Sequence, residues 1–171
     1  MLVYAMVYLN KILVTTDMSD YSLAAVEYAS SLGLLYNSSI YLLRVQDETP
    51  PVFRLQGVDV DPHQFTQRAE EDAQRELEDF AAKRISLDLK FIPVVRSGSP
   101  AEEIKRFAEG EGIDLIVIAT HGRTGLRHIV LGSVAEKVVR TSSVPVLAVK
   151  PRTFRENIIK SEDIEDELHL Q

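Results

Sequence analysis

The fold is decided by one stretch, Asp114-Leu-Ile-Val-Ile-Ala-Thr-His-Gly-Arg-Thr-Gly-Leu-Arg-His-Ile-Val-Leu-Gly-Ser-Val-Ala-Glu-Lys137. It opens with an apolar run, Leu115 to Ala119, that is rich in β-branched residues and too short for a helix. Such a run is typical of a strand buried on both faces of a parallel sheet. A glycine-containing loop follows. Ser133 and Glu136 then form a Ser-x-x-Glu capping box, which predicts that Ser133 caps a helix.

The order of strand, glycine loop and helix start indicates an anion-binding site. Glycine lets a ligand approach the backbone without a Cβ in the way. The N–H groups of Ser133 and Val134 have no intrahelical acceptor and lie at the positive end of the helix dipole. The surrounding basic residues are Arg123, Arg127, Lys137, Arg140 and Lys150, against one acidic residue, Glu136. We therefore predict that this segment binds phosphate. The alternative is that it only connects the strand to the helix, binds no ligand, and uses Ser133 as a helix cap.

Two common phosphate-binding motifs are absent. A Walker A loop needs Gly-Lys-Ser/Thr, but Ser133 follows Gly132 directly, and no Gly-x-Gly-x-x-Gly occurs. The stretch instead resembles the nucleotide-binding signature of the universal stress protein family, Gly-x2-Gly-x9-Gly-Ser/Thr. Gly122, nine residues and Gly132-Ser133 match its second half, whereas Ala119 stands at the position of the first glycine. The resemblance covers roughly residues 8 to 151.

Composition limits the class of protein. With 171 residues, 45% hydrophobic and 26% charged, the chain is expected to form one soluble domain over residues 1–151, followed by an acidic tail over 152–171. No cysteine is present, so disulfides and thiolate chemistry are excluded. The net charge of -7 argues against nucleic-acid binding. The apolar start, Met1 to Leu9, is about half as long as a membrane span, so we expect a cytoplasmic protein.

The rest of the chain alternates between predicted strands and helices. Strands are predicted over residues 11–17, 40–45, 87–95, 115–119 and 144–149. Helices are predicted from a cap at Ser19 or Asp20 to a weak end near Gly33 and Asn37, over 65–83, from a cap at Ser99, and over 133–141. Residues 46–63 are predicted to be a surface loop that could cover the pocket. The predicted buried stripes are Ala24, Ala25, Tyr28, Ala29 and Leu32; Phe65, Ala69, Ala73, Leu77 and Phe80; and Ile104, Phe107 and Ala108.

This alternation predicts an α/β fold: an open, mostly parallel five-stranded sheet with helices on both faces. The family resemblance implies the strand order 3-2-1-4-5 and an adenine nucleotide α-hydrolase-like architecture. Pro145 near the start of the last strand predicts an edge strand or a strand start. An apolar edge needs cover, so we expect a homodimer through the fifth strand, Val144 to Val149, as the resemblance also implies. The tail could form a short helix on the dimer or a partner, or be disordered.

Open parallel sheets bind ligands beyond the carboxyl ends of their strands. The resemblance implies that Thr16, Asp17, Val45 and Ile118 line a base and ribose pocket, with Ala119 at the motif's start. Phosphates would be held by Gly122, Gly132, Ser133 and Val134. Several structural alternatives stay open. Asp17 could simply cap its turn without contacting a ligand, and Gly125 could be a turn glycine. Gly110 and Gly112 could end a helix, and His121 and His128 could be loop or rim residues.

Three functions remain. The first is an ATP-binding (or AMP- or ADP-binding) stress-response regulator, in which nucleotide changes the affinity for a second copy or an unknown protein partner. Mg²⁺ or Mn²⁺ could bridge the phosphates, although no carboxylate cluster demands a metal. The second is a slow ATPase or nucleotidyl transferase, against which no catalytic residues can be identified. The third is an interaction module that has lost nucleotide binding, consistent with Ala119.

Overall fold

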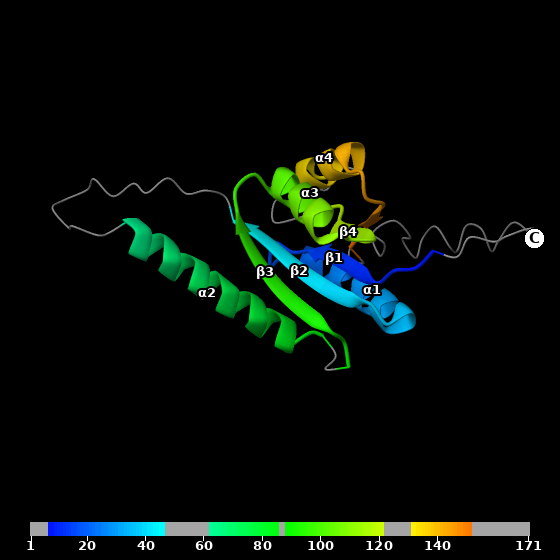
Figure 1. Cartoon of the computed structure of the whole chain (residues 1–171), viewed down its shortest axis with the longest axis horizontal. Helices are drawn as coiled ribbons and strands as arrows, with labels where there is room; N and C mark the ends of the chain where they lie inside the picture. Colours follow the sequence, from blue (N-terminus) through cyan, green and yellow to red (C-terminus); the bar gives the residue numbers. More distant parts are fainter. Residues whose placement is uncertain (1–6, 47–61, 86–87, 122–130, 152–171) are drawn as a thin grey trace, which may run out of the picture.

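The structure, a computed structural model, describes residues 7–46, 62–85, 88–121 and 131–151. Its centre is a five-stranded sheet in the order β3-β2-β1-β4-β5 (Figure 1). Every neighbouring pair of strands is parallel, so the predicted sheet type and strand order are confirmed. The strands are β1 (Lys11–Thr15), β2 (Ser39–Gln46), β3 (Phe91–Ser97), β4 (Leu115–Ala119) and β5 (Val146–Val149).

Helices cover both faces of the sheet, α1 and α2 on one and α3 and α4 on the other (Figure 1). They are α1 (Asp20–Tyr36), α2 (Pro62–Ala82), α3 (Pro100–Glu111) and α4 (Ser133–Thr141). The core is correspondingly divided into two clusters. Ile12 and Val14 of β1 pack in the cluster under α1 and α2, and Leu13 packs in the cluster under α3 and α4. Because the strand is covered on both sides, every central position is apolar.

The third strand lies further along the chain than predicted. It was expected over 87–95, but β3 runs from Phe91 to Ser97 and pairs with β2 as far as Gln46. Leu89 precedes the strand and is buried in the cluster under α1 and α2. The predicted start was too early because the alternation of apolar residues begins in the turn before β3. The predicted end was too early because pairing with the long strand β2 extends β3 to Ser97.

The fifth strand begins at Val146, two residues later than predicted. Pro145 has no N–H to donate to the sheet, but its carbonyl accepts a hydrogen bond from the Ile116 N–H at 2.9 Å. β5 is an edge strand, as Pro145 predicted.

Helix α1 runs through Gly33 and ends at Tyr36, followed by Asn37 in the left-handed conformation at φ 54°. Gly33 packs closely against β2, because a Cβ there would lie 2.7 Å from Ile40 Cδ1 and the Ile40 side chain would have to shift. The end of the helix, with its C-cap at Asn37, lies within the weak end predicted near Gly33 and Asn37. Tyr28, predicted in the buried stripe, is exposed.

Helix α2 begins at Pro62, so the predicted loop over 46–63 ends earlier than expected, with proline at the first helical position. Ala69 is exposed rather than buried. The predicted core positions that are buried are Ala73, Leu77 and Phe80 of α2 and Ile104, Phe107 and Ala108 of α3. The Phe65 side chain, residues 1–6, the rest of the loop over 47–61 and the tail over 152–171 lie outside the described residues. Within the described segments, none of the helices combines the length and apolar character needed to cross a membrane.

Candidate functional site

The strand order of the sheet reverses between β1 and β4. From β1 the chain passes through α1 to β2 on one side, while β4 pairs with β1 in parallel on the other. Thr16 follows β1 and Thr120 follows β4, so both lie at the same carboxyl edge. Open α/β sheets bind ligands at such a reversal. Asp17, Ile118 and Ala119 lie at the same edge.

Thr16 is buried and fixes the turn between β1 and α1. Its Oγ1 lies 2.8 Å from the Ser22 Oγ and accepts a hydrogen bond from the Met18 N–H at 2.9 Å. Its own N–H donates to the Leu43 carbonyl of β2 at 3.0 Å. The Thr16 hydroxyl is thus used to hold the turn.

Asp17 also stabilises this turn. Its Oδ1 accepts hydrogen bonds from the Ser19 N–H at 3.0 Å and the Ser19 Oγ at 2.5 Å. Ser19 is the N-cap of α1, but its hydroxyl bonds to Asp17 and not to the helix. Met18 has φ 66°, a left-handed conformation that costs a non-glycine residue of order 1 kcal/mol. The structure therefore shows the turn-capping role that the sequence left open for Asp17.

The side chains at the ends of β2 and β4 pack mainly into the core. Ile118 is buried in the cluster under α3 and α4, so it has almost no side-chain surface left for a ligand. Val45 packs against the same cluster but is only half-buried. Ala119 is also half-buried, and it packs against the opposite cluster, under α1 and α2.

Gly132 lies where the chain returns to the sheet after β4. Its N–H donates to the Thr120 carbonyl oxygen at 2.7 Å. A Cβ at Gly132 would lie 3.2 Å from that oxygen, closer than side chains ordinarily approach a carbonyl. Its φ of -66° is open to any residue. The close approach of two backbone segments therefore favours glycine here, independently of any ligand.

Helix α4 begins at Ser133, so the prediction that Ser133 caps it was wrong by one residue. Gly132 is the N-cap, and no side chain makes a capping hydrogen bond. The first helical bond runs from the Glu136 N–H to the Gly132 carbonyl at 2.8 Å. The N–H groups of Ser133 and Val134 precede that bond, so they have no intrahelical acceptor, as predicted.

Thr120 and His121 are buried polar residues at this edge. They are 3% and 8% exposed, and the Thr120 Oγ1 lies 2.9 Å from the His121 Nδ1. Sequence reasoning missed Thr120 and treated His121 as a loop or rim residue. The signal that could have found them is a pair of polar residues placed directly after a fully apolar strand.

Charges near α4 are partly neutralised within the protein. Lys137 of α4 lies 2.8 Å from the Glu102 carboxylate of α3, which also pairs with Lys105 at 3.2 Å. The hydrogen bond from Lys137, followed by that from Lys105, holds the pKa of Glu102 below its ordinary value. Lys137 therefore contributes less free positive charge to the edge than its sequence position suggests.

The predictions for Gly122, Arg123, Gly125, Arg127 and His128 lie outside the described residues. Across the remainder, no group of three or more His, Asp or Glu side chains is arranged to hold a metal ion.

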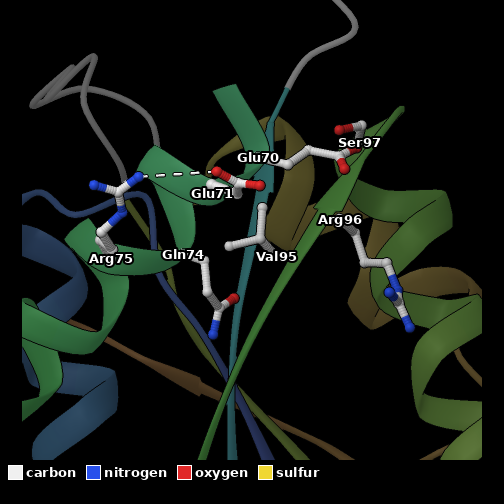
Figure 2. Close-up of a pocket in the computed structure, with 7 residues that line it drawn as sticks. All are labelled: Glu70, Glu71, Gln74, Arg75, Val95, Arg96 and Ser97. Atoms are coloured by element: carbon white, nitrogen blue, oxygen red, sulfur yellow. Dashed lines mark ion pairs between the residues drawn. The ribbon is translucent and has the colours of Figure 1, made fainter. Parts of the chain in front are cut away.

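A separate hollow of about 620 Å³ lies between α2 and the carboxyl end of β3 (Figure 2). Its Glu71 and Arg75 are paired at 3.9 Å on α2. Arg96 points away from α2, and its guanidinium lies 5.6 Å from the centre of the Phe107 ring of α3. The lining is Glu70, Glu71, Gln74, Arg75, Val95, Arg96 and Ser97. The acidic and basic side chains that line this hollow balance in charge, so it lacks the net positive charge predicted for the β1–β4 edge.

Known proteins are similar to this chain over nearly all of its described length. The model of the universal stress protein family matches residues 9–150. Universal stress protein MJ0577 of Methanocaldococcus jannaschii is 31% identical over 82% of this chain and 94% of its own length. Universal stress protein MJ0531 of the same organism is 35% identical over 82% of each chain.

Solved structures share the architecture. The structure of the hypothetical protein MJ0577 matches with a TM-score of 0.69 and 32% identity, over 85% of this chain and 97% of the other. A universal stress protein in complex with cAMP matches with a TM-score of 0.56 and 26% identity, over 84% of this chain and 98% of the other. The predicted adenine nucleotide α-hydrolase-like fold is thereby confirmed.

Proposed function

Because the chain belongs to the universal stress protein family, we propose that it binds an adenine nucleotide at the carboxyl edge of β1 and β4. One observation carries the proposal: the Gly132 N–H meets the Thr120 carbonyl at 2.7 Å, which starts α4 at the reversal of the sheet. The first N–H groups of α4 are then available to phosphate oxygens. The relative in complex with cAMP supports an adenine nucleotide as the ligand.

ATP is the proposed ligand, with AMP or ADP as weaker candidates. Thr16, Asp17 and the half-buried Val45 would border the base and ribose, together with the backbone of Ile118 and Ala119. Main-chain N–H groups at Gly122, Ser133 and Val134 would meet the phosphates, with Gly132 allowing their approach. Mg²⁺ or Mn²⁺ would be held by the phosphates themselves, because the described carboxylates form no metal site.

The proposed role is regulatory. β5 is an edge strand with an exposed Ala148 and half-buried Val146 and Leu147. Antiparallel pairing of β5 with its copy across a two-fold axis would cover this edge. In a cytoplasmic regulator of this kind, nucleotide would change the affinity for the second copy or for a regulatory protein partner.

The proposal is tested with purified protein in two steps. Mass spectrometry of co-purifying small molecules identifies the nucleotide carried from the cell. Calorimetry with ATP, ADP, AMP, cAMP and adenosine then ranks affinity, and we expect affinity to rise with the number of phosphates. A protein that binds none of these ligands would contradict the proposal, and release of inorganic phosphate from ATP would favour a slow ATPase.

A further inference from the structure

Thr120 anchors both ends of the connection between β4 and α4. Its N–H donates to the Val149 carbonyl of β5 at 2.9 Å, which continues the pairing beyond the strand. Its carbonyl accepts the Gly132 N–H at 2.7 Å, where the connection ends. Its side-chain Oγ1 lies 2.9 Å from the Nδ1 of His121, where the connection begins. Thr120 therefore contacts the residues at which the connection begins and ends, and it also pairs with β5.

The contact between the Thr120 and His121 side chains is buried, which raises the cost of losing it. Thr120 and His121 are almost fully buried, so each polar group would be costly to leave without a hydrogen bond. A valine at position 120 has nearly the volume of threonine, so packing alone does not call for the hydroxyl. The contact between Thr120 Oγ1 and His121 Nδ1, called the link below, therefore fixes how these two side chains lie where β4 ends and the connection begins.

We propose that Thr120 and His121 are positioning residues, which hold the first turn of α4 at the ligand edge so that its N–H groups meet the phosphates. This inference rests on the proposed nucleotide function. The link acts on the helix start through the Thr120 carbonyl and Gly132. Its loss weakens the phosphate-dependent part of binding and leaves the contribution of the base and ribose unchanged, because the turn after β1 is held separately by Thr16 and Asp17.

Calorimetry of ATP and adenosine with wild type, Thr120→Val and Thr120→Ser tests this. The Val variant removes the hydroxyl at nearly constant volume, and the Ser variant keeps it. The ratio of ATP affinity to adenosine affinity should fall about tenfold in Thr120→Val and stay within about twofold of wild type in Thr120→Ser. An unchanged ratio in Thr120→Val, or an equal loss for both ligands, would overturn the inference, because the latter indicates a merely structural role.

A second pair of variants covers the case in which Thr120→Val does not fold. His121→Asn keeps a polar atom near the Nδ1 position, and His121→Leu does not, so only His121→Leu should lower the ratio. Hydrogen exchange of the Gly132 N–H in nucleotide-free protein gives an independent readout and should speed up about tenfold without the link. Unchanged exchange would overturn the inference even if wild type bound no nucleotide. Failure of wild type to bind contradicts the proposed function instead.

Discussion

Helices α3 and α4 pack on the same face of the sheet, and each begins just beyond the carboxyl end of a strand. Their first turns differ in backbone donors. In α3, Pro100 has no N–H, and the N–H groups of Glu102 and Glu103 both donate to the Ser99 carbonyl, at 3.0 and 2.9 Å. In α4, the first N–H bonded to the N-cap carbonyl is that of Glu136, four residues after Gly132. More donors at the start of α4 are therefore left for an external acceptor.

The two helix starts also differ in charge. Glu102 and Glu103 place two carboxylates in the first turn of α3, where they interact favourably with the positive end of the helix dipole. The first turn of α4 has only Glu136. Helix α3 thus meets more of its own donor and dipole requirements than α4 does within the described residues, and this difference is what the proposed phosphate site at α4 uses.

The largest effect is expected from giving α4 the acidic first turn of α3. Ser133 is exposed, so Ser133→Glu adds a carboxylate at the helix start without disturbing the core. Repulsion of phosphate should lower ATP affinity about 100-fold, by an effect of order 3 kcal/mol. The same charge should raise stability by about 0.5 kcal/mol through the helix dipole. Calorimetry and urea unfolding measure the two changes, with Ser133→Gln as the neutral control. Equal ATP affinity in the Glu and Gln variants would show that no phosphate lies there.

Gly132→Ala should have the next largest effect. The added Cβ would lie 3.2 Å from the Thr120 oxygen, so the start of α4 must shift by a few tenths of an ångström. We expect about a tenfold loss of ATP affinity and a destabilisation of about 1 kcal/mol. Calorimetry and urea unfolding measure them, and circular dichroism should stay native. Wild-type ATP affinity in this variant would mean that the position of α4 does not matter for binding.

Sequence patterns predicted the elements well because the deciding signals are local. The run from Leu115 to Ala119 is short, rich in β-branched residues and apolar at every position, as a strand covered on both faces requires. The helix starts at Pro100 and Ser133 were also located from adjacent residues. The exact N-cap of α4 was missed because Gly132 and Ser133 both suit that position, and the hydrogen bond from the Gly132 N–H to Thr120 joins residues that are not neighbours in the sequence.

The site itself was only partly predictable. Thr16 and Asp17 lie beyond the carboxyl end of β1, as predicted, but their bonds to Ser22 and Ser19 depend on the shape of the turn. His121 is buried, although its polar character and its place after the strand suggested a loop or rim residue. Residue type and spacing identified the candidate residues, whereas their hydrogen bonds and burial became clear only from the tertiary structure.

A substitution in α3 should leave ligand binding unchanged. Gly110 lies inside α3 and a Cβ there would meet nothing within 4 Å, whereas Gly112 at φ 63° ends the helix. Gly110→Ala should therefore stabilise the protein by about 0.5 to 1 kcal/mol, because alanine loses less backbone entropy on folding. ATP affinity should not change. Urea unfolding and calorimetry check both, and a loss of stability would mean that the end of α3 is more constrained than its open surroundings indicate.

The smallest effect is expected at the ion pair that joins the two helices. Lys137 and Lys105 hold the pKa of Glu102 below its ordinary value of 4.5, so the charged carboxylate is favoured in the folded state. Its contribution to stability is present at neutral pH and is lost as pH falls through the folded pKa, below 4.5. Glu102→Gln should lower the melting temperature slightly at pH 7, because exposed pairs contribute little. As the pH falls through the folded pKa the wild-type carboxyl takes up a proton, so the two melting temperatures should converge. A gap that keeps the same size as the pH is lowered would show that the Gln side chain, and not the lost charge, causes the change.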